Sequence, residues 1–303
     1  MLYYRRKYLL AIFELFGKQL SARMVQKILF LSTRGKDATK VYDFVPFKYG
    51  SYSFQANKDL ENLCSNGYLR LISINGHTGY EHIYDGLLLQ DLDIFDRKRL
   101  CDTRDALKDK TENEIIKFVY ENYPFYAINS SIADDILDKQ ALEKIRNTKA
   151  KLHKEEAELF TIGYESLSLE AYLVKLLLKD VHVLCDVRKN AYSQKFGFSK
   201  AALRNGCEGV GINYIHISEL GIESNKRQHL VTQEDYNLLF DEYEKTVLVQ
   251  NADFLNIIID ELYENHRVAL TCFEKNPLQC HRSRVAKAVK QKLKGNINFE
   301  NII

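Results

Sequence analysis

The chain has 303 residues, of which 46% are hydrophobic and 28% charged, and its net charge is +2. This composition is typical of a folded globular protein, and the length favours two domains. No apolar run approaches the roughly 18–20 residues that a membrane-spanning helix needs, so we expect no membrane contact. Six cysteines are too few for a disulfide scaffold, and the start of the chain lacks the pattern of a signal peptide. The sequence therefore predicts a cytoplasmic protein with reduced thiols.

Positive charge is concentrated at the front of the chain. Residues 1–70 contain 12 Lys/Arg and five Asp/Glu, a net charge of +7. A basic front on a nearly neutral protein favours a nucleic-acid partner, here DNA, although a solvated helical surface has the same composition. The predicted DNA-binding residues are Arg23, Lys27, Lys48 and Lys58.

The first elements of the chain follow the order of a winged helix. Residues 9–16 have a wide apolar face that predicts a helix, and Ser21 is a suitable N-cap for a second helix. Residues 54–66 predict a third helix. Strand-like runs on either side of Asn75-Gly76 predict a β-hairpin. In a winged helix the helices contact DNA and the hairpin forms the wing.

One short motif resembles a known family. The segment 42–53 (YDFVPFKYGSYS), together with the preceding helix motif QKILF at residues 26–30, is similar to the Panacea antitoxin-type winged-helix domain over about residues 5–130. Ser51 stands where that family usually has proline. The resemblance implies recognition of protein or DNA rather than catalysis. Alternatively, the alternating aromatic residues simply form a strand that packs on the helices: Tyr42, Phe44, Phe47 and Tyr49.

The end of the first half predicts more helices and a boundary. Residues 111–147 predict two further helices, and Thr111 with Glu114 forms the capping box of the first. The charged segment 148–158 is the predicted domain boundary and has the composition of a helical linker. The expected domains are a winged-helix-like recognition domain with extra helices over residues 1–150 and a second domain over residues 159–303.

Strands and helices alternate in the second half. This order, together with strands that are apolar almost throughout, predicts a three-layer α/β domain with a mostly parallel sheet. The expected strands are residues 159–162, 181–185, 213–217 and 268–271, and the expected helices are residues 168–179, 199–205, 233–265 and the segment from 282.

Reactive side chains follow each predicted strand. Tyr164 follows the first strand, Asp186 and Arg188 the second, His216 the third, and Cys272 with Glu274 the fourth. Ligands bind beyond the carboxyl ends of parallel strands, so we expect these groups to share one pocket. The triplet Cys280-His281-Arg282 adds a thiol, an imidazole and a guanidinium at the start of the last helix, where anions and thiolates are favoured.

These residues carry a second resemblance, to the family named domain of unknown function 488, over about residues 159–293. The motifs match in order: TIGYES at 161–166, CDVR at 185–188, FSKAAL at 198–203, GINYIH at 211–216, ELG at 219–221, CFEK at 272–275 and CHR at 280–282. The position after the opening glycine is often histidine in that family and is Tyr164 here. The resemblance implies a functional site but no particular reaction.

The residue types suggest roles, each with an alternative. Asp186 and Glu274 are the candidate proton-transfer groups, and Cys280 and His281 the candidate nucleophile and acid–base group. Alternatively, Asp186 and Arg188 form a structural ion pair, and His216 is a buried histidine with satisfied hydrogen bonds. The predicted ligand- or phosphate-binding residues are Tyr164, Arg188, His216, Arg282 and Arg284.

No cofactor is expected, but the sequence leaves one metal site open. Cys272, Cys280 and His281 are three ligand types that suit zinc, and His216 or Asp186 would be the fourth. The wide spacing of the two cysteines is unlike that of structural zinc sites.

Two functions follow from this reading. The first is an enzyme, a hydrolase or transferase, that processes nucleic acid or a nucleotide and is targeted by the DNA-binding domain. The second is a DNA-binding regulator whose α/β domain senses a small anionic ligand without catalysis. The sequence leaves a homodimer open.

Overall fold

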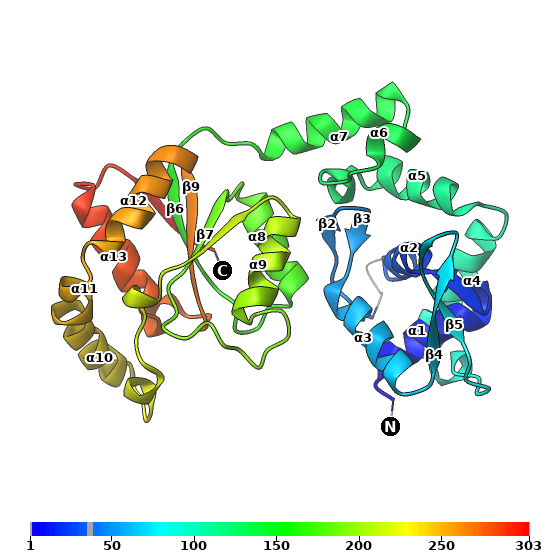
Figure 1. Cartoon of the computed structure of the whole chain (residues 1–303), viewed down its shortest axis with the longest axis horizontal. Coiled ribbons are helices and arrows are strands. Elements are labelled where there is room, and N and C mark those ends of the chain that lie inside the picture. Colours follow the sequence, from blue (N-terminus) through cyan, green and yellow to red (C-terminus); the bar gives the residue numbers. More distant parts are fainter. Residues whose placement is uncertain (1, 35–38, 303) are drawn as a thin grey trace. The chain divides into compact units, whose positions relative to one another are not determined.

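The computed structural model describes residues 2–34 and 39–302 of the chain. It divides into two compact units, Met1–Lys151 and Leu152–Ile303 (Figure 1). The division falls inside the charged segment 148–158. Among the described residues, no helix combines the length and the hydropathy that crossing a membrane requires.

The N-terminal unit combines helices with short antiparallel strands. Strand β1 pairs with β5, which pairs with β4, and β2 pairs with β3 in a separate small sheet. The elements are α1 (Tyr4–Phe16), β1 (Gln19–Ser21), α2 (Ala22–Ser32), β2 (Val45–Phe47), β3 (Gly50–Tyr52), α3 (Phe54–Ser65), β4 (Leu69–Ile74), β5 (His77–His82), α4 (Ile94–Leu107), α5 (Glu112–Asn122), α6 (Ala133–Ile136) and α7 (Lys139–Leu152), with 3₁₀ turns η1 (Leu89–Asp91) and η2 (Pro124–Ala127).

The predicted helix caps and the predicted hairpin turn of this unit are confirmed. The Ser21 hydroxyl accepts a hydrogen bond from the Met24 amide at the start of α2. The capping box of Thr111 and Glu114 is present at the start of α5. The hairpin β4–β5 turns at Asn75-Gly76 as expected. Whether the unit is a winged helix stays a prediction.

Two features of the N-terminal unit differ from the expectation, and a third was not specified by it. Helix α4 was not predicted because it is highly charged and buries little of its surface. The alternating aromatic segment forms only the short strand β2, followed by a turn into β3. Helix α7 begins at Lys139, where the Asp138 side chain accepts a hydrogen bond from the Ala141 amide.

The C-terminal unit is an α/β domain. Its described strands form one five-stranded sheet in the order β10-β6-β9-β7-β8, and every neighbouring pair is parallel. The elements are β6 (Glu158–Gly163), α8 (Leu169–Leu178), β7 (Val183–Asp186), α9 (Lys200–Gly209), β8 (Asn213–His216), α10 (Gln233–Lys245), α11 (Val247–Gln250), α12 (Phe254–Asn265), β9 (Arg267–Cys272), α13 (Arg282–Lys292) and β10 (Asn298–Ile302), with 3₁₀ turns η3 (Ser218–Leu220), η4 (Ser224–Arg227) and η5 (Pro277–Gln279).

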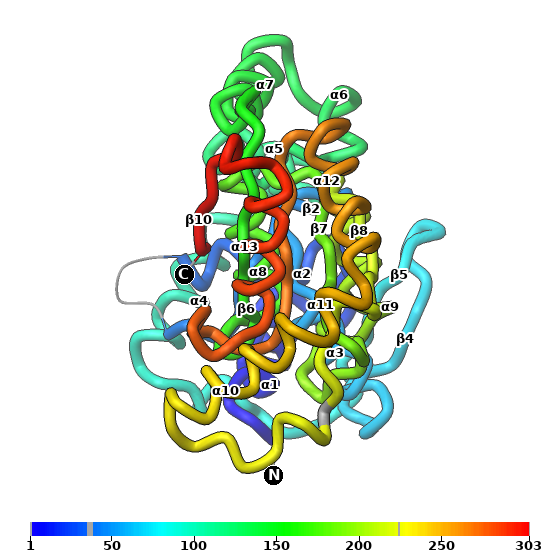
Figure 2. Tube along the Cα trace, turned by 90° about the vertical axis from the view of Figure 1, so that its left-hand side faces the viewer, coloured from blue at the N-terminus to red at the C-terminus, as the bar shows by residue number. Residues whose placement is uncertain are grey.

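Helices cover both faces of this sheet. Helices α8 and α9 lie on one face, and α12 and α13 lie on the other (Figure 1). Strands β10 and β8 are the two edges (Figure 2). The predicted parallel α/β architecture is confirmed, with β10 as an additional edge strand. It was not predicted because most of its residues are exposed or half-buried.

Strand β9 lies at the centre of the sheet and is buried along its whole length. It carries Cys272 to the carboxyl edge. Gly163, at the end of the neighbouring β6, allows the loop after β9 to come close, since a Cβ on it would lie 1.8 Å from the Glu274 carbonyl oxygen. Gly221 does the same for the loops after β7 and β8, since its Cβ would lie 2.0 Å from the Lys189 amide nitrogen. These contacts shape the edge where the site lies.

Candidate functional site

A cavity of about 370 Å³ opens at the carboxyl edge of the parallel sheet. This volume is in the range of sites for small molecules. Its walls come from the loops after β6, β7 and β9, and from the segment that contains η4. The lining residues are Tyr164, Arg188, Lys189, Asn190, Tyr192, Ser193, Gln194, Ile222, Arg227, Cys272, Phe273 and His281.

Cys272 and His281 lie side by side at this cavity. Cys272 Sγ lies 3.7 Å from His281 Nδ1, within the range of a sulfur hydrogen bond. The other ring nitrogen, Nε2, lies 2.8 Å from the Val187 carbonyl oxygen and must donate its hydrogen there. His281 Nδ1 therefore keeps its lone pair and faces the thiol. A nucleophile, a base and a group that orients the base are the components of an activated thiol.

The two thiols of the site have opposite pKa shifts. The Cys280 thiol donates a hydrogen bond to Cys272 and, with the positive charges of Arg227 and Arg282, lowers the pKa of Cys272 to about 7. Burial raises the pKa of Cys280 to about 12, and the hydrogen bond to Cys272 adds to this effect. Cys280 was the predicted nucleophile. The structure instead favours Cys272, because a thiolate is the nucleophilic form of cysteine.

Asp186 and Arg188 form a buried ion pair, which was the alternative to a functional role for these residues. The Asp186 carboxylate is fully buried and accepts hydrogen bonds from Arg188 at 2.5 and 2.8 Å and from the Tyr214 hydroxyl at 2.6 Å. Asp186 does not line the cavity. These contacts remove it from the candidate proton-transfer groups and make it the anchor of Arg188.

Arg188 faces the cavity, but most of its N–H groups are already engaged. Besides Asp186, it donates to the Tyr164 hydroxyl at 2.7 Å and to the Phe198 carbonyl at 2.8 Å. Tyr164 in turn stacks on Phe198, with 4.3 Å between ring centroids. A bidentate phosphate contact would therefore require Arg188 to give up bonds that it makes within the protein. Its positive charge still acts on the cavity, since Arg188 and Tyr164 both line it.

Glu274 lies beside the Cys272 thiol and forms an ion pair with Arg227. One Glu274 carboxylate oxygen lies 3.7 Å from Cys272 Sγ, and the other pairs with Arg227. This pairing places the Arg227 guanidinium at the cavity, which it lines. Glu274 is thus close enough to Cys272 to exchange a proton, but it is not one of the residues that line the cavity.

Three predicted ligand-binding residues lie outside the cavity. The Arg282 guanidinium is buried and donates to the Glu274 and Lys275 carbonyls, so it fixes the loop after β9. Arg284 pairs with Glu244 at 3.1 Å. His216 Nε2 lies 2.8 Å from the Arg188 carbonyl oxygen, as the alternative of a hydrogen-bonded histidine held. A phosphate-binding role for these side chains is not supported by their positions.

Two cations of the cavity were not among the predicted site residues. Arg227 lies in the segment around η4, which has no periodic pattern and was assigned no role. Lys189 follows Arg188 directly and was not proposed as a site residue. No sequence signal identifies Arg227, because its position depends on the fold of an irregular segment.

The metal alternative has geometric support. Among the described residues, the ligand atoms of Cys272, Cys280 and His281 all lie within 4.8 Å of one another, and all three side chains are buried. A histidine that donates its second nitrogen to a backbone carbonyl is the usual arrangement of a metal ligand. Two thiolates and one imidazole would suit Zn²⁺ with an open fourth position.

The predicted DNA-binding residues of the N-terminal unit differ in accessibility. Lys27 is only 1% exposed, and its ammonium donates to the Tyr49 and Ser51 carbonyls at 2.5 and 3.0 Å. Lys27 is therefore not exposed on the surface as a contact with the phosphates of a DNA duplex requires. Lys48 and Lys58 are exposed, and Lys58 pairs with Glu61. Arg23 is half-buried and pairs with Glu112 at 2.9 Å.

The comparison with protein families identifies the site-bearing segment. Residues 168–289 match the family model described as Domain of unknown function DUF488. The DUF488 segment runs from the start of α8 to α13 and includes Cys272, Glu274, Cys280 and His281. It supports the resemblance inferred from the C-terminal motifs and does not reach the N-terminal unit. No curated protein and no solved structure matches the chain.

Proposed function

We propose that the C-terminal unit is a thiol-dependent enzyme that acts on a phosphate-bearing substrate, a nucleotide or a nucleic acid. The main support for this proposal is that the Cys272–His281 pair borders a cavity of about 370 Å³ that is also lined by Arg188, Lys189 and Arg227. Cations beside a thiol favour both an anionic substrate and the thiolate.

The reaction would proceed through a covalent intermediate. His281 Nδ1 takes the proton of Cys272, and the thiolate bonds to an electrophilic phosphorus or carbon of the substrate. The bond to the leaving group breaks, and the leaving group receives the proton from His281. Water then attacks the intermediate, His281 accepts its proton, and Cys272 leaves as the thiolate.

The remaining side chains would bind and orient. Arg227 binds the negatively charged group of the substrate, and Glu274 holds the Arg227 guanidinium in position. Asp186 keeps Arg188 in place from behind the cavity. Phe273 and Tyr192 are exposed aromatic residues at the rim and offer faces on which a base can stack.

The test is turnover of a panel of nucleoside phosphates, single-stranded DNA and duplex DNA by the full chain. We expect one class of substrate to be cleaved, Cys272→Ser to abolish cleavage, and Arg227→Ala to raise KM. Arg284→Ala is the control for Arg227→Ala, because Arg284 is also paired with a glutamate, Glu244, but does not line the cavity. Full activity of Cys272→Ser would refute the proposal.

Nucleotide binding without turnover would favour the alternative function, a DNA-binding regulator that senses an anionic ligand. In that case Arg227→Ala changes the effect of the nucleotide on DNA binding. The DNA-binding role rests on Arg23, Lys48 and Lys58, since Lys27 is buried.

A metal-dependent site is the second candidate, supported by the convergence of Cys272, Cys280 and His281. Elemental analysis of the purified protein and the absorption of a Co²⁺-substituted sample distinguish a metal site from a free thiol. One tightly held metal ion per chain, lost in Cys280→Ala, would favour the metal site. A metal-free protein with full turnover would favour the free thiol.

A further inference from the structure

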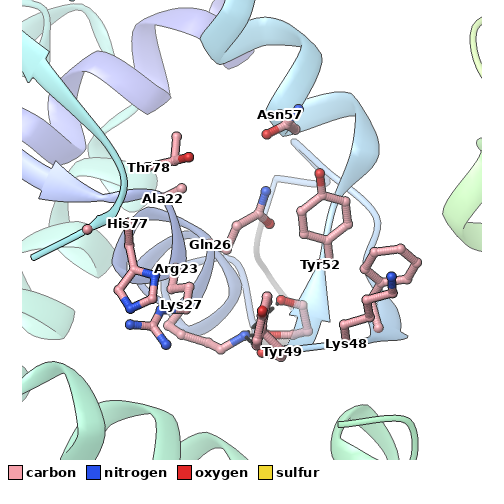
Figure 3. A pocket seen from close by; sticks show the side chains of 13 residues that line it. Ala22, Arg23, Gln26, Lys27, Lys48, Tyr49, Tyr52, Asn57, His77 and Thr78 are labelled. Carbon is pink, nitrogen blue, oxygen red and sulfur yellow. Dashed lines mark hydrogen bonds between the residues drawn. The ribbon is translucent and has the colours of Figure 1, made fainter. Parts of the chain in front are cut away.

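The N-terminal unit contains a second cavity, of about 430 Å³ (Figure 3). It lies between the first turns of α2, the turn that joins β2 to β3, the start of α3 and the turn of the β4–β5 hairpin. In Figure 3, Arg23 and His77 lie on one side, Tyr52 on the other, and Gln26 between them. The lining residues are Ala22, Arg23, Gln26, Lys27, Phe47, Lys48, Tyr49, Ser51, Tyr52, Asn57, Gly76, His77 and Thr78.

The charges that line this cavity are all positive. Arg23, Lys27 and Lys48 contribute cations, His77 adds an imidazole, and none of the described lining residues is an aspartate or glutamate. Three of the four residues predicted to bind DNA therefore share one concave site instead of a flat surface. A concave basic site of about 430 Å³ has room for a single anionic group.

Lys27 is buried, and among the described residues no carboxylate lies within ion-pair distance of its ammonium. Its ammonium donates only to uncharged acceptors, the Tyr49 and Ser51 carbonyls and the Ser51 hydroxyl. Buried charges in proteins are normally paired, since removing an ion from water is costly. Burial, followed by the charge of Arg23, lowers the pKa of Lys27 to about 7, and the more distant Glu112 carboxylate offsets only part of this effect. An anion in the cavity would supply the missing negative charge.

Arg23 is available to the same anion at its outer end. Its Nε lies 2.9 Å from a Glu112 carboxylate oxygen, which orients the guanidinium and offsets part of its charge. Lys48 is exposed at the opposite rim and has no ion pair among the described residues. Arg23 and Lys48 thus flank the opening above Lys27.

One wall of the cavity is aromatic. Phe47 and Tyr52 stack with 5.1 Å between ring centroids and 23° between ring planes, and both line the cavity. Tyr49 is 48% exposed at the opening, with the Arg23 guanidinium 5.9 Å from its ring centroid. Aromatic rings beside basic groups form the usual site for a single unpaired nucleotide, because bases stack on the rings and the cations hold the phosphate.

We propose that this cavity binds one nucleotide, either free or as the unpaired end of a nucleic-acid strand. The base contacts the aromatic wall of Phe47 and Tyr52, and the phosphate lies between Arg23 and Lys48 over the Lys27 ammonium. This site is separate from the cavity at Cys272 and does not depend on the enzymatic proposal.

The test measures binding to the full chain carrying Arg227→Ala, which removes one of the cations that line the C-terminal cavity. The probes are adenosine, adenosine monophosphate, inorganic phosphate, a 5′-phosphorylated single strand, the same strand without phosphate, and a blunt duplex without terminal phosphates. We expect the monophosphate to bind about tenfold or more tightly than adenosine, because the phosphate makes charge-assisted hydrogen bonds. The phosphorylated single strand should compete with it if strand ends enter the cavity.

Lys48→Glu and Lys58→Glu are matched variants of exposed lysines, of which only Lys48 lines the cavity. Lys48→Glu should weaken binding of the monophosphate about tenfold or more, and Lys58→Glu should change it little. Tyr52→Leu should reduce the preference for the monophosphate over inorganic phosphate.

Equal binding of adenosine and its monophosphate, or equal losses in the two lysine variants, would overturn the proposal. So would stronger binding of the blunt duplex than of the single strand.

Discussion

The hydrogen bond from Cys280 to Cys272 should control the reactivity of the site. Cys280→Ala removes the donor that is the largest cause of the lowered Cys272 pKa. With a pKa of about 7, roughly half of Cys272 is thiolate at pH 7, whereas at the ordinary value of 9.0 about 1% would be. Cys280→Ala should therefore slow alkylation of Cys272 at pH 7 by up to about 50-fold.

The assay is alkylation by iodoacetamide between pH 5 and 10, read for each cysteine by mass spectrometry of peptides. In the wild type, the Cys272 rate should rise with pH and reach half its maximum near pH 7, because the thiolate forms as pH rises through its pKa. Cys280→Ser keeps a hydroxyl donor and should retain most of this rate. Faster modification of Cys280 than of Cys272, or a Cys280→Ala protein with an unchanged profile, would refute the reasoning.

Three further substitutions test the fold around the site and the N-terminal unit. Asp186→Asn leaves the buried Arg188 charge uncompensated and should lower the free energy of unfolding by about 3–5 kcal/mol in urea titrations. A loss below about 1 kcal/mol would contradict a structural ion pair. Gly163→Ala places a methyl group against the Glu274 carbonyl and should cost about 1–3 kcal/mol and slow Cys272 alkylation by shifting the loop. Thr111→Ala removes the cap of α5 and should cost about 1 kcal/mol, with Cys272 alkylation unchanged.

The features that the sequence predicted best are those set by local chemistry. Ser21 and Thr111 specify helix starts through their own side chains, and Asn75-Gly76 specifies a turn through its backbone preferences. The alternation of apolar strands with helices predicted the parallel sheet, because each strand must be buried on both faces. Helix α4 and strand β10 lack such apolar patterns and were missed.

The assignment of roles within the site depended on tertiary contacts that no local pattern reveals. The sequence predicted that Cys272, Glu274, Cys280 and His281 lie in one region, and in the structure they lie close together. It could not rank the two thiols, since their pKa values depend on which one donates to the other and on the position of Arg227. The sequence also led us to expect an accessible Lys27. Its burial could not be predicted, because the carbonyls that enclose its ammonium come from a turn more than 20 residues away.

The cavity combines a residue at the end of the central strand β9 with residues of an irregular segment. Cys272 ends a strand that is hydrogen-bonded on both sides, by β6 and by β7. Arg227 belongs to a short irregular segment on the rim. On the proposed function, substitutions in the rim segment would change substrate preference while the thiol keeps its position, so chains with the same strand end and different rims would catalyse one reaction on different substrates.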